Sequence, residues 1–170
     1  MHRLHLLRHA KSSRDAEIED RDRRLNKRGR EAARLLAAAL PAALGPVDLV
    51  LCSPARRTRE TAELVLSGFA IAPELLFDDA LYLATPAALV ARLRRVGEAT
   101  GVVLVVGHNP GLHELALLLA DPTSPRYKAV AAGKFPTLAR ASFAIDGNWA
   151  MIERSRHALT DYVTPKSPAD

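Results

Sequence analysis

Two histidines and two arginines are the residues of this sequence whose types and positions best suit phosphate chemistry. Arg8-His9 follows one short apolar run, and His108 follows another. Arg57 lies four residues beyond Ser53, which directly follows a third apolar run. A neutral imidazole can attack phosphorus, and guanidinium groups bind phosphoryl oxygens through charge-assisted, often bidentate hydrogen bonds. A single histidine at such a place is more often structural, but two histidines with arginines beside them indicate a phosphate site.

The apolar runs must be strands if these side chains are to meet. Residues 4–7, 47–52 and 102–106 have the length of buried strands. The run 102–106 is β-branched and apolar on both faces, which is typical of a central parallel strand. Ligands of open α/β sheets bind beyond the carboxyl ends of the strands. We therefore expect the histidines and arginines to converge on one pocket at that edge.

Helix signals alternate with these strands. Asn26 can cap a helix whose apolar face carries Ala32, Leu36 and Leu40. A serine, threonine or asparagine followed by proline marks three further helix starts. The alternation predicts an α/β fold of three layers, with a mainly parallel central sheet and helices on both faces. The further starts are Ser53-Pro54, Thr85-Pro86 and Asn109-Pro110, and residues 74–77 form another short strand.

The last third of the chain and one early segment depart from this alternation. Residues 141–145 and 149–152, joined at Asp146-Gly147-Asn148, predict an antiparallel hairpin. The polar segment 14–24 predicts a solvated loop, and the tail from Thr164 is expected to fray.

Length and composition are those of one globular domain. The 170 residues, with 48% hydrophobic and 25% charged residues, predict a single domain over 1–170. A single cysteine, Cys52, excludes an intramolecular disulfide and is expected to be a buried strand residue. The charged start and the lack of an uncharged apolar run of about 18 residues argue against a signal peptide and a membrane span. We expect a cytoplasmic protein.

The charge balance suits a phosphorylated substrate. Lys and Arg number 24 against 19 Asp and Glu, for a net charge of +5. Such a domain could also bind nucleic acid, and a non-catalytic nucleic-acid-binding module is the alternative from a different class. Aromatic residues are only 5% and are not interleaved with the cations, which argues against that module. Because acidic residues do not gather at the strand ends, we expect no metal and no cofactor.

Three motifs resemble those of a known family. L-L-R-H-A-K-S at 6–12, C-S-P-A-R-R-T-R-E-T-A at 52–62 and V-V-G-H-N-P-G at 105–111 are similar to the signatures of the histidine phosphatase superfamily. The resemblance implies a phosphoglycerate mutase-like fold. The short chain, D-R-R-L-N-K-R-G at 22–29 and K-F-P-T at 134–137 resemble the SixA-like phosphohistidine phosphatase branch.

The resemblance also implies roles for individual residues. His9 matches the histidine that becomes phosphorylated, Arg8 and Arg57 match the phosphate-binding arginines, and His108 matches the second histidine of the phosphate pocket. Ser12 and Asn109 are further candidates for binding phosphate or substrate. Ala10 stands where the family usually has glycine, so we infer an ordinary backbone conformation there.

The expected activity is metal-independent hydrolysis through a covalent phosphohistidine on His9. The substrate would be a phosphohistidine protein or a small phosphate monoester. In the second case the chain would be a small-molecule phosphomonoesterase. The sequence predicts no oligomeric state. Too few residues lie between Thr61 and Asp78 for a lid, so we expect an open, shallow site. Asp79, or its neighbour Asp78, could protonate a leaving group, or both could simply solvate a turn.

Overall fold

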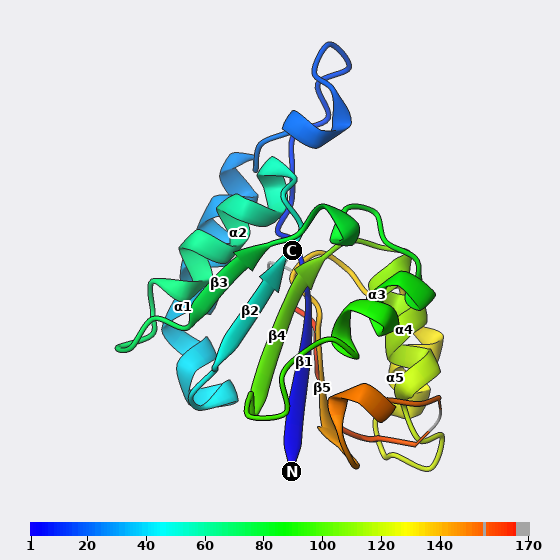
Figure 1. Ribbon diagram of the computed structural model, residues 1–170. Helices are drawn as coiled ribbons and strands as arrows, with labels where there is room; N and C mark the ends of the chain where they lie inside the picture. Colours follow the sequence, from blue (N-terminus) through cyan, green and yellow to red (C-terminus); the bar gives the residue numbers. More distant parts are fainter. Residues whose placement is uncertain (155, 166–170) are drawn as a thin grey trace.

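A six-stranded sheet forms the middle layer of the computed structural model, which describes residues 1–154 and 156–165 (Figure 1). The strands are β1 (His2–Arg8), β2 (Leu49–Cys52), β3 (Glu74–Phe77), β4 (Val102–Gly107), β5 (Arg140–Ile145) and β6 (Ala158–Val163). Their order is β3-β2-β4-β1-β5-β6. The first four in that order are parallel to one another, and β5 and β6 add an antiparallel edge. The predicted α/β sheet is therefore confirmed.

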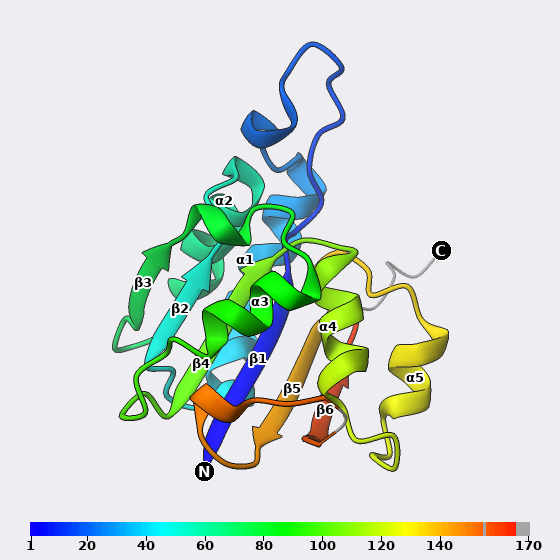
Figure 2. The ribbon, with the colours of Figure 1, turned by 45° about the vertical axis from the view of Figure 1, so that its right-hand side comes forward.

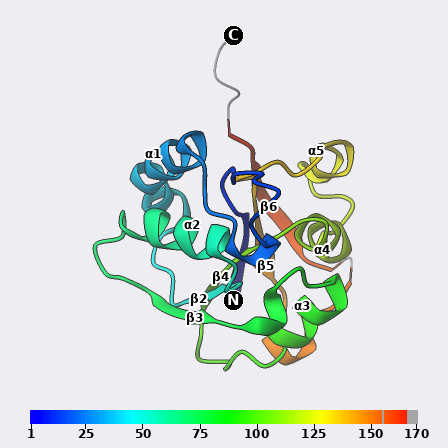
Figure 3. The ribbon, with the colours of Figure 1, turned by 90° about the horizontal axis from the view of Figure 1, so that it is seen from above.

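Helices cover both faces of this sheet. They are α1 (Lys27–Leu44), α2 (Arg56–Leu66), α3 (Pro86–Leu93), α4 (Gly111–Leu119) and α5 (Tyr127–Ala132). Seen from above, α1 and α2 lie on one face and α3, α4 and α5 on the other (Figure 3). Short 3-10 helices occur at Asp20–Asp22, Asp79–Leu81 and Trp149–Met151. No helix in the described ranges is long and apolar enough to cross a membrane.

The pleat of the strands divides the buried side chains between two cores. Leu4 and Leu6 of β1 pack with the helices α3 and α4, whereas Leu7 packs with α1 and α2. All six residues of β4 are buried, as predicted for a central strand covered on both faces. Cys52 is fully buried at the end of β2, and burial raises the pKa of its thiol to about 12, so it is a core residue.

Helix α1 begins as predicted but turns a different face inward. The Asn26 side chain accepts a hydrogen bond from the Gly29 amide, which caps the helix. The residues buried against the sheet include Ala33 and Ala37 as well as the predicted Leu40, while Ala32 and Leu36 are only partly buried. A run of alanines leaves the helical stripe ambiguous in sequence, and packing against the sheet and α2 selects it.

The predicted hairpin is wrong. β5 pairs with β6 instead, and residues 149–151 form a 3-10 turn. Trp149 is fully buried, and its indole N–H donates to the Thr100 carbonyl at 2.7 Å. Burial of this large ring draws the segment away from the sheet edge, which leaves the pairing position to β6. The predicted fraying from Thr164 concerns mainly residues 166–170, which lie outside the described residues.

The sheet brings three strand ends to one edge. Arg8 at the end of β1 pairs with Gly107 at the end of β4, and Cys52 at the end of β2 pairs with Val106. The next residues along the chain are therefore neighbours. The segment between β1 and α1, which contains the 3-10 turn Asp20–Asp22, rises above this edge beside α2 (Figures 1 and 2).

Candidate active site

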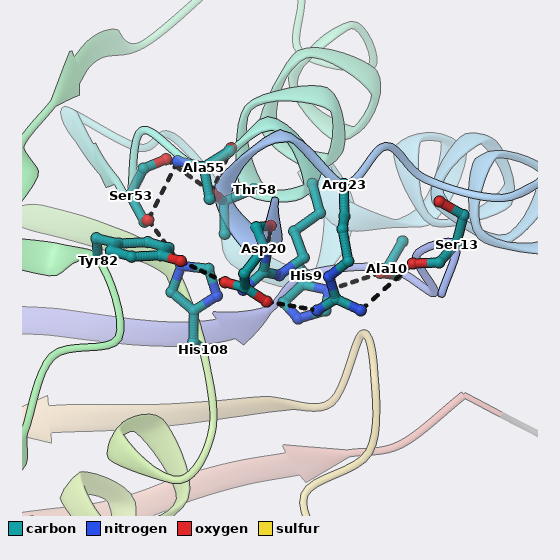
Figure 4. A network of polar contacts seen from close by, with 11 residues as sticks. His9, Ala10, Ser13, Asp20, Arg23, Ser53, Ala55, Thr58, Tyr82 and His108 are labelled. Carbon is teal, nitrogen blue, oxygen red and sulfur yellow. Dashed lines mark hydrogen bonds and ion pairs between the residues drawn. The ribbon is translucent and has the colours of Figure 1, made fainter. Parts of the chain in front are cut away.

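His9 and His108 face each other at this edge, as the strand ends predict. Their ring centroids are 5.5 Å apart, and both side chains are buried (Figure 4). Each follows the last residue of a parallel strand, β1 or β4, so the sheet register itself sets their spacing. Two imidazoles at this distance can both touch one tetrahedral oxyanion.

The ring of His9 is oriented for attack through Nε2. Its Nδ1 lies 2.6 Å from the Ala10 carbonyl oxygen, an acceptor that holds the ring proton on Nδ1. Burial, followed by the charges of Arg8 and Arg57, lowers the pKa of His9 to about 4, against the opposing effect of the Ala10 hydrogen bond. The ring is therefore neutral at pH 7, with an unprotonated Nε2.

The backbone beside His9 is held by α2. The Ala10 amide donates to the Thr61 hydroxyl at 2.9 Å, and that hydroxyl donates to the Arg57 carbonyl. Ala10 does not have a positive φ, so the ordinary backbone inferred from the sequence is confirmed. Positive φ occurs instead at Phe135 and Leu138, whose loop contacts the carbonyls of residues 8 and 9 through the Leu138 amide.

Arg57 is fully enclosed, although it is a charged residue on the first turn of α2. Its side chain is only 2% exposed. Nη1 donates to the Asp20 carbonyl at 2.7 Å and Nη2 to the Asp20 carboxylate at 3.0 Å. These bonds use the outer end of the guanidinium, and Nε is buried without a partner in the described part of the chain. Nε–H and the second N–H of Nη2 are thus donors that the bonds to Asp20 do not use.

Arg8 adds a second guanidinium close to the first. Its Nη1 donates to the Phe135 carbonyl at 3.3 Å. Burial and the nearby charge of Arg57 lower the pKa of Arg8, so the two cations repel each other in a partly dehydrated site. An anion between them would relieve that repulsion, which is the electrostatic condition for binding a phosphoryl group.

Asp20, Arg23 and Tyr82 belong to the site but were not found from the sequence. The Asp20 carboxylate accepts hydrogen bonds from Arg57 and from the Tyr82 hydroxyl. It also forms an ion pair with Arg23 at 3.1 Å (Figure 4). Partial burial opposes ionisation, but the Tyr82 and Arg57 hydrogen bonds outweigh it and lower the pKa of Asp20. Segment 14–24 carries several acids and arginines of similar character, so no local pattern distinguishes Asp20 and Arg23 within it.

His108 is held by Ser53 and kept neutral. The Ser53 hydroxyl lies 2.7 Å from Nε2 of His108. Burial and then the charge of Arg57 lower the pKa of His108 to about 3. The helix predicted to start at Ser53-Pro54 begins later: α2 starts at Arg56, with Ala55 as its N-cap residue and no side-chain capping bond. The serine contacts the site instead.

The other predicted binding residues lie on the two loops that flank the histidines. The Asn109 amide donates to the carbonyls of Lys134 and Phe135, at 3.2 and 2.8 Å, and so joins the loop after β4 to the loop behind Arg8. Ser12 is half-buried, and its backbone forms a bridge with Leu25. Their roles toward substrate stay predictions.

Both carboxyl groups that could serve as an acid are paired with arginines. Asp79 is exposed and bonds to Arg21 at 2.6 Å. Asp78 bonds to Arg92 at 2.7 Å, and its hydrogen bond from the Ala80 amide, together with Arg92, lowers the pKa of this carboxyl. An ionised Asp78 cannot donate a proton.

We expect the fold to lose stability as the pH falls from about 6.5 toward 4. Burial lowers the pKa values of His5, His9 and His108 to about 4, 4 and 3. Between these values and the ordinary histidine pKa, the unfolded chain binds more protons than the folded one, so stability present above pH 6.5 is lost on acidification. The loss should be on the order of a few kcal/mol. Urea unfolding at pH 7.5, 6 and 5 measures it, and a constant unfolding free energy would contradict it.

Comparison with known proteins identifies a family model and several similar chains. Residues 4–81 match the family model described as histidine phosphatase superfamily (branch 1). An uncharacterized protein of Mycobacterium tuberculosis is 38% identical over 163 residues, which cover 94% of this chain and all of that protein. An uncharacterized protein of Mycobacterium leprae is 32% identical with the same coverage.

Two solved structures with a similar fold are assigned a narrower function than the family model states. The protein assigned as phosphohistidine phosphatase SixA of Nakamurella multipartitia superposes with a TM-score of 0.84 at 27% identity, covering 98% of this chain and 97% of that chain. The protein with the same assignment from Agrobacterium tumefaciens gives 0.80 at 27% identity, covering 96% and 98%.

Proposed function

This chain belongs to branch 1 of the histidine phosphatase superfamily, and from that membership we propose that it hydrolyses protein phosphohistidine through a covalent intermediate on His9. The observation that carries the proposal is the state of His9: neutral, with Nδ1 bonded to a carbonyl, Nε2 free, and a second imidazole 5.5 Å away. This is the arrangement that a nitrogen nucleophile requires.

The first step would form a bond between Nε2 of His9 and phosphorus while the bond from phosphorus to the substrate breaks. The ring keeps its Nδ1 proton, so the phosphorylated imidazole carries a positive charge, which the Ala10 carbonyl stabilises. Arg8 and Arg57 would bind the phosphoryl oxygens and offset the charge of the transition state. In the second step the oxygen of a water molecule attacks phosphorus, dihydrogen phosphate leaves with both water protons, and neutral His9 is restored.

The leaving group supports phosphohistidine over an ordinary ester. An alkoxide needs a proton donor, whereas a phosphohistidine with a protonated ring leaves as neutral imidazole. Asp20, Asp78 and Asp79 all pair with arginines, and hydrogen bonds lower the pKa values of Asp20 and Asp78. A substrate that brings its own proton therefore fits this site best.

The surface near the site carries a cleft of about 490 Å³ between residues 21–22 and the start of α2. The segment 61–78, predicted to be too short for a lid, consists of the end of α2, a connecting loop and β3. The cleft is lined by Arg21, Asp22, Pro54, Arg56, Arg59, Glu60 and Glu63.

A ranking of substrates tests the proposal. The value of kcat/KM for a phosphohistidine-carrying protein domain should exceed the values for phosphoserine, sugar phosphates and p-nitrophenyl phosphate by at least about tenfold, because imidazole needs no external acid. If a small ester is the better substrate by orders of magnitude, the chain is a small-molecule phosphomonoesterase and the proposal is wrong.

A further inference from the structure

We infer that Ser53 is a positioning residue for His108: its hydroxyl donates to Nε2 and thereby selects the tautomer whose Nδ1–H faces the phosphoryl group. The inference deepens the proposed phosphatase function, on which it rests for its catalytic consequence. The position of the His108 ring proton can be measured without a substrate.

Ser53 is held beside His108 by the sheet. Its side chain is fully buried, and its backbone amide donates to the Val106 carbonyl of β4 at 3.1 Å. Because His108 follows β4 by one residue, this bond keeps the serine next to the histidine. The result is the 2.7 Å contact between the Ser53 hydroxyl and Nε2 of His108.

The other contacts of the hydroxyl favour one direction of this hydrogen bond. The Ala55 amide points at the Ser53 oxygen from 3.4 Å, so the oxygen already serves as an acceptor. Its own hydrogen is then free to be donated to Nε2. A neutral imidazole carries one proton, and if Nε2 accepts, that proton must be on Nδ1.

The free nitrogen of His108 has the position of a ligand donor. Nδ1 is buried and has no hydrogen-bond partner among the described residues. A buried N–H without a partner is costly, and a phosphoryl oxygen would satisfy it. In Figure 4 the His108 ring lies between Ser53 and the group formed by Asp20 and His9. The opposite tautomer would place a lone pair toward the anion and repel it.

The hydroxyl is not needed to start the neighbouring helix. Helix α2 has Ala55 as its N-cap residue, with no side-chain capping bond. Thr58 secures the same turn by donating to the carbonyls of Ser53 and Ala55, at 2.7 and 2.8 Å. The shorter contact of the Ser53 hydroxyl is the one to His108, at 2.7 Å, against 3.4 Å to the Ala55 amide of the turn.

The test is ¹⁵N NMR of histidine-labelled protein, with the His108 signals assigned from the loss seen in a His108→Gln variant. The wild type should show a protonated Nδ1 and an unprotonated Nε2, and Ser53→Ala should shift the population toward protonated Nε2. Binding of inorganic phosphate and turnover should each weaken about tenfold, because the donor toward the anion is lost. Ser53→Cys, which keeps a weaker donor of similar size, should lie in between.

Thr58→Val is the matched control, since it removes a buried hydroxyl from the same turn without touching His108. It should leave the His108 tautomer unchanged. A Ser53→Ala protein that keeps protonated Nδ1 and wild-type phosphate affinity would overturn the inference. If Ser53→Ala changes the His108 tautomer but the wild-type protein does not hydrolyse phosphohistidine, the proposed function is overturned and the positioning role of Ser53 stands.

Discussion

Replacement of His9 by alanine should abolish the phosphorylated enzyme and lower turnover by about a thousandfold or more. The expected loss is large because the substitution removes the atom that forms the bond to phosphorus, and the remaining arginines can only bind the anion. The ring lost is neutral, buried, and oriented through the Ala10 carbonyl, so a water molecule in its place would be neither aimed nor comparably nucleophilic.

The measurement combines turnover with trapping of the adduct. Protein is mixed with a ³²P-labelled phosphohistidine donor, quenched in alkali, and tested for a protein-bound phosphate that is stable to base and labile to acid. His2→Ala is the matched control, since His2 lies on the same strand but at its other end, where its ring packs near Trp149. An active wild type that never carries the adduct, or a His9→Ala protein that still does, would contradict the covalent route.

Substitution of Arg57 by lysine should lower kcat/KM by about a hundredfold, even though the charge is kept. The guanidinium is bound by Asp20 along its outer end, which leaves a planar edge for the phosphoryl oxygens. An ammonium group cannot hold both sets of bonds from this buried position. Loss of one oriented donor to a developing anion costs about 10²–10³ in rate.

Arg56→Lys provides the comparison, because Arg56 is the exposed neighbour that pairs with Glu60 at 2.8 Å. It should retain wild-type kinetics. Vanadate affinity measured on both variants separates binding from chemistry: we expect Arg57→Lys to weaken it and Arg56→Lys not to. Equal activity of Arg57→Lys and wild type would show that only charge, and not the planar fork, matters at this position.

Several parts of the fold could be predicted because their signals are local. The run 102–106 is apolar on both faces, and only a central strand buries both. Thr85 caps α3 through a hydrogen bond from the Ala88 amide, as its place before a proline predicts. The hairpin predicted for 141–145 and 149–152 does not form, although its turn residues favour it locally. Burial of Trp149 outweighs that local preference, and this burial depends on the whole core.

The convergence of His9 and His108 could be predicted from the chain alone, because both follow apolar runs typical of parallel strands, and parallel strands end at one edge. The groups that orient these histidines became evident only from the three-dimensional fold. Asp20 comes from a loop 37 positions before Arg57, and Tyr82 follows a strand at the edge of the sheet. The positions of such loop residues depend on packing between distant segments, a many-body free energy that no short motif encodes. The same holds for Ser53, whose partner is chosen by the pairing of β2 with β4.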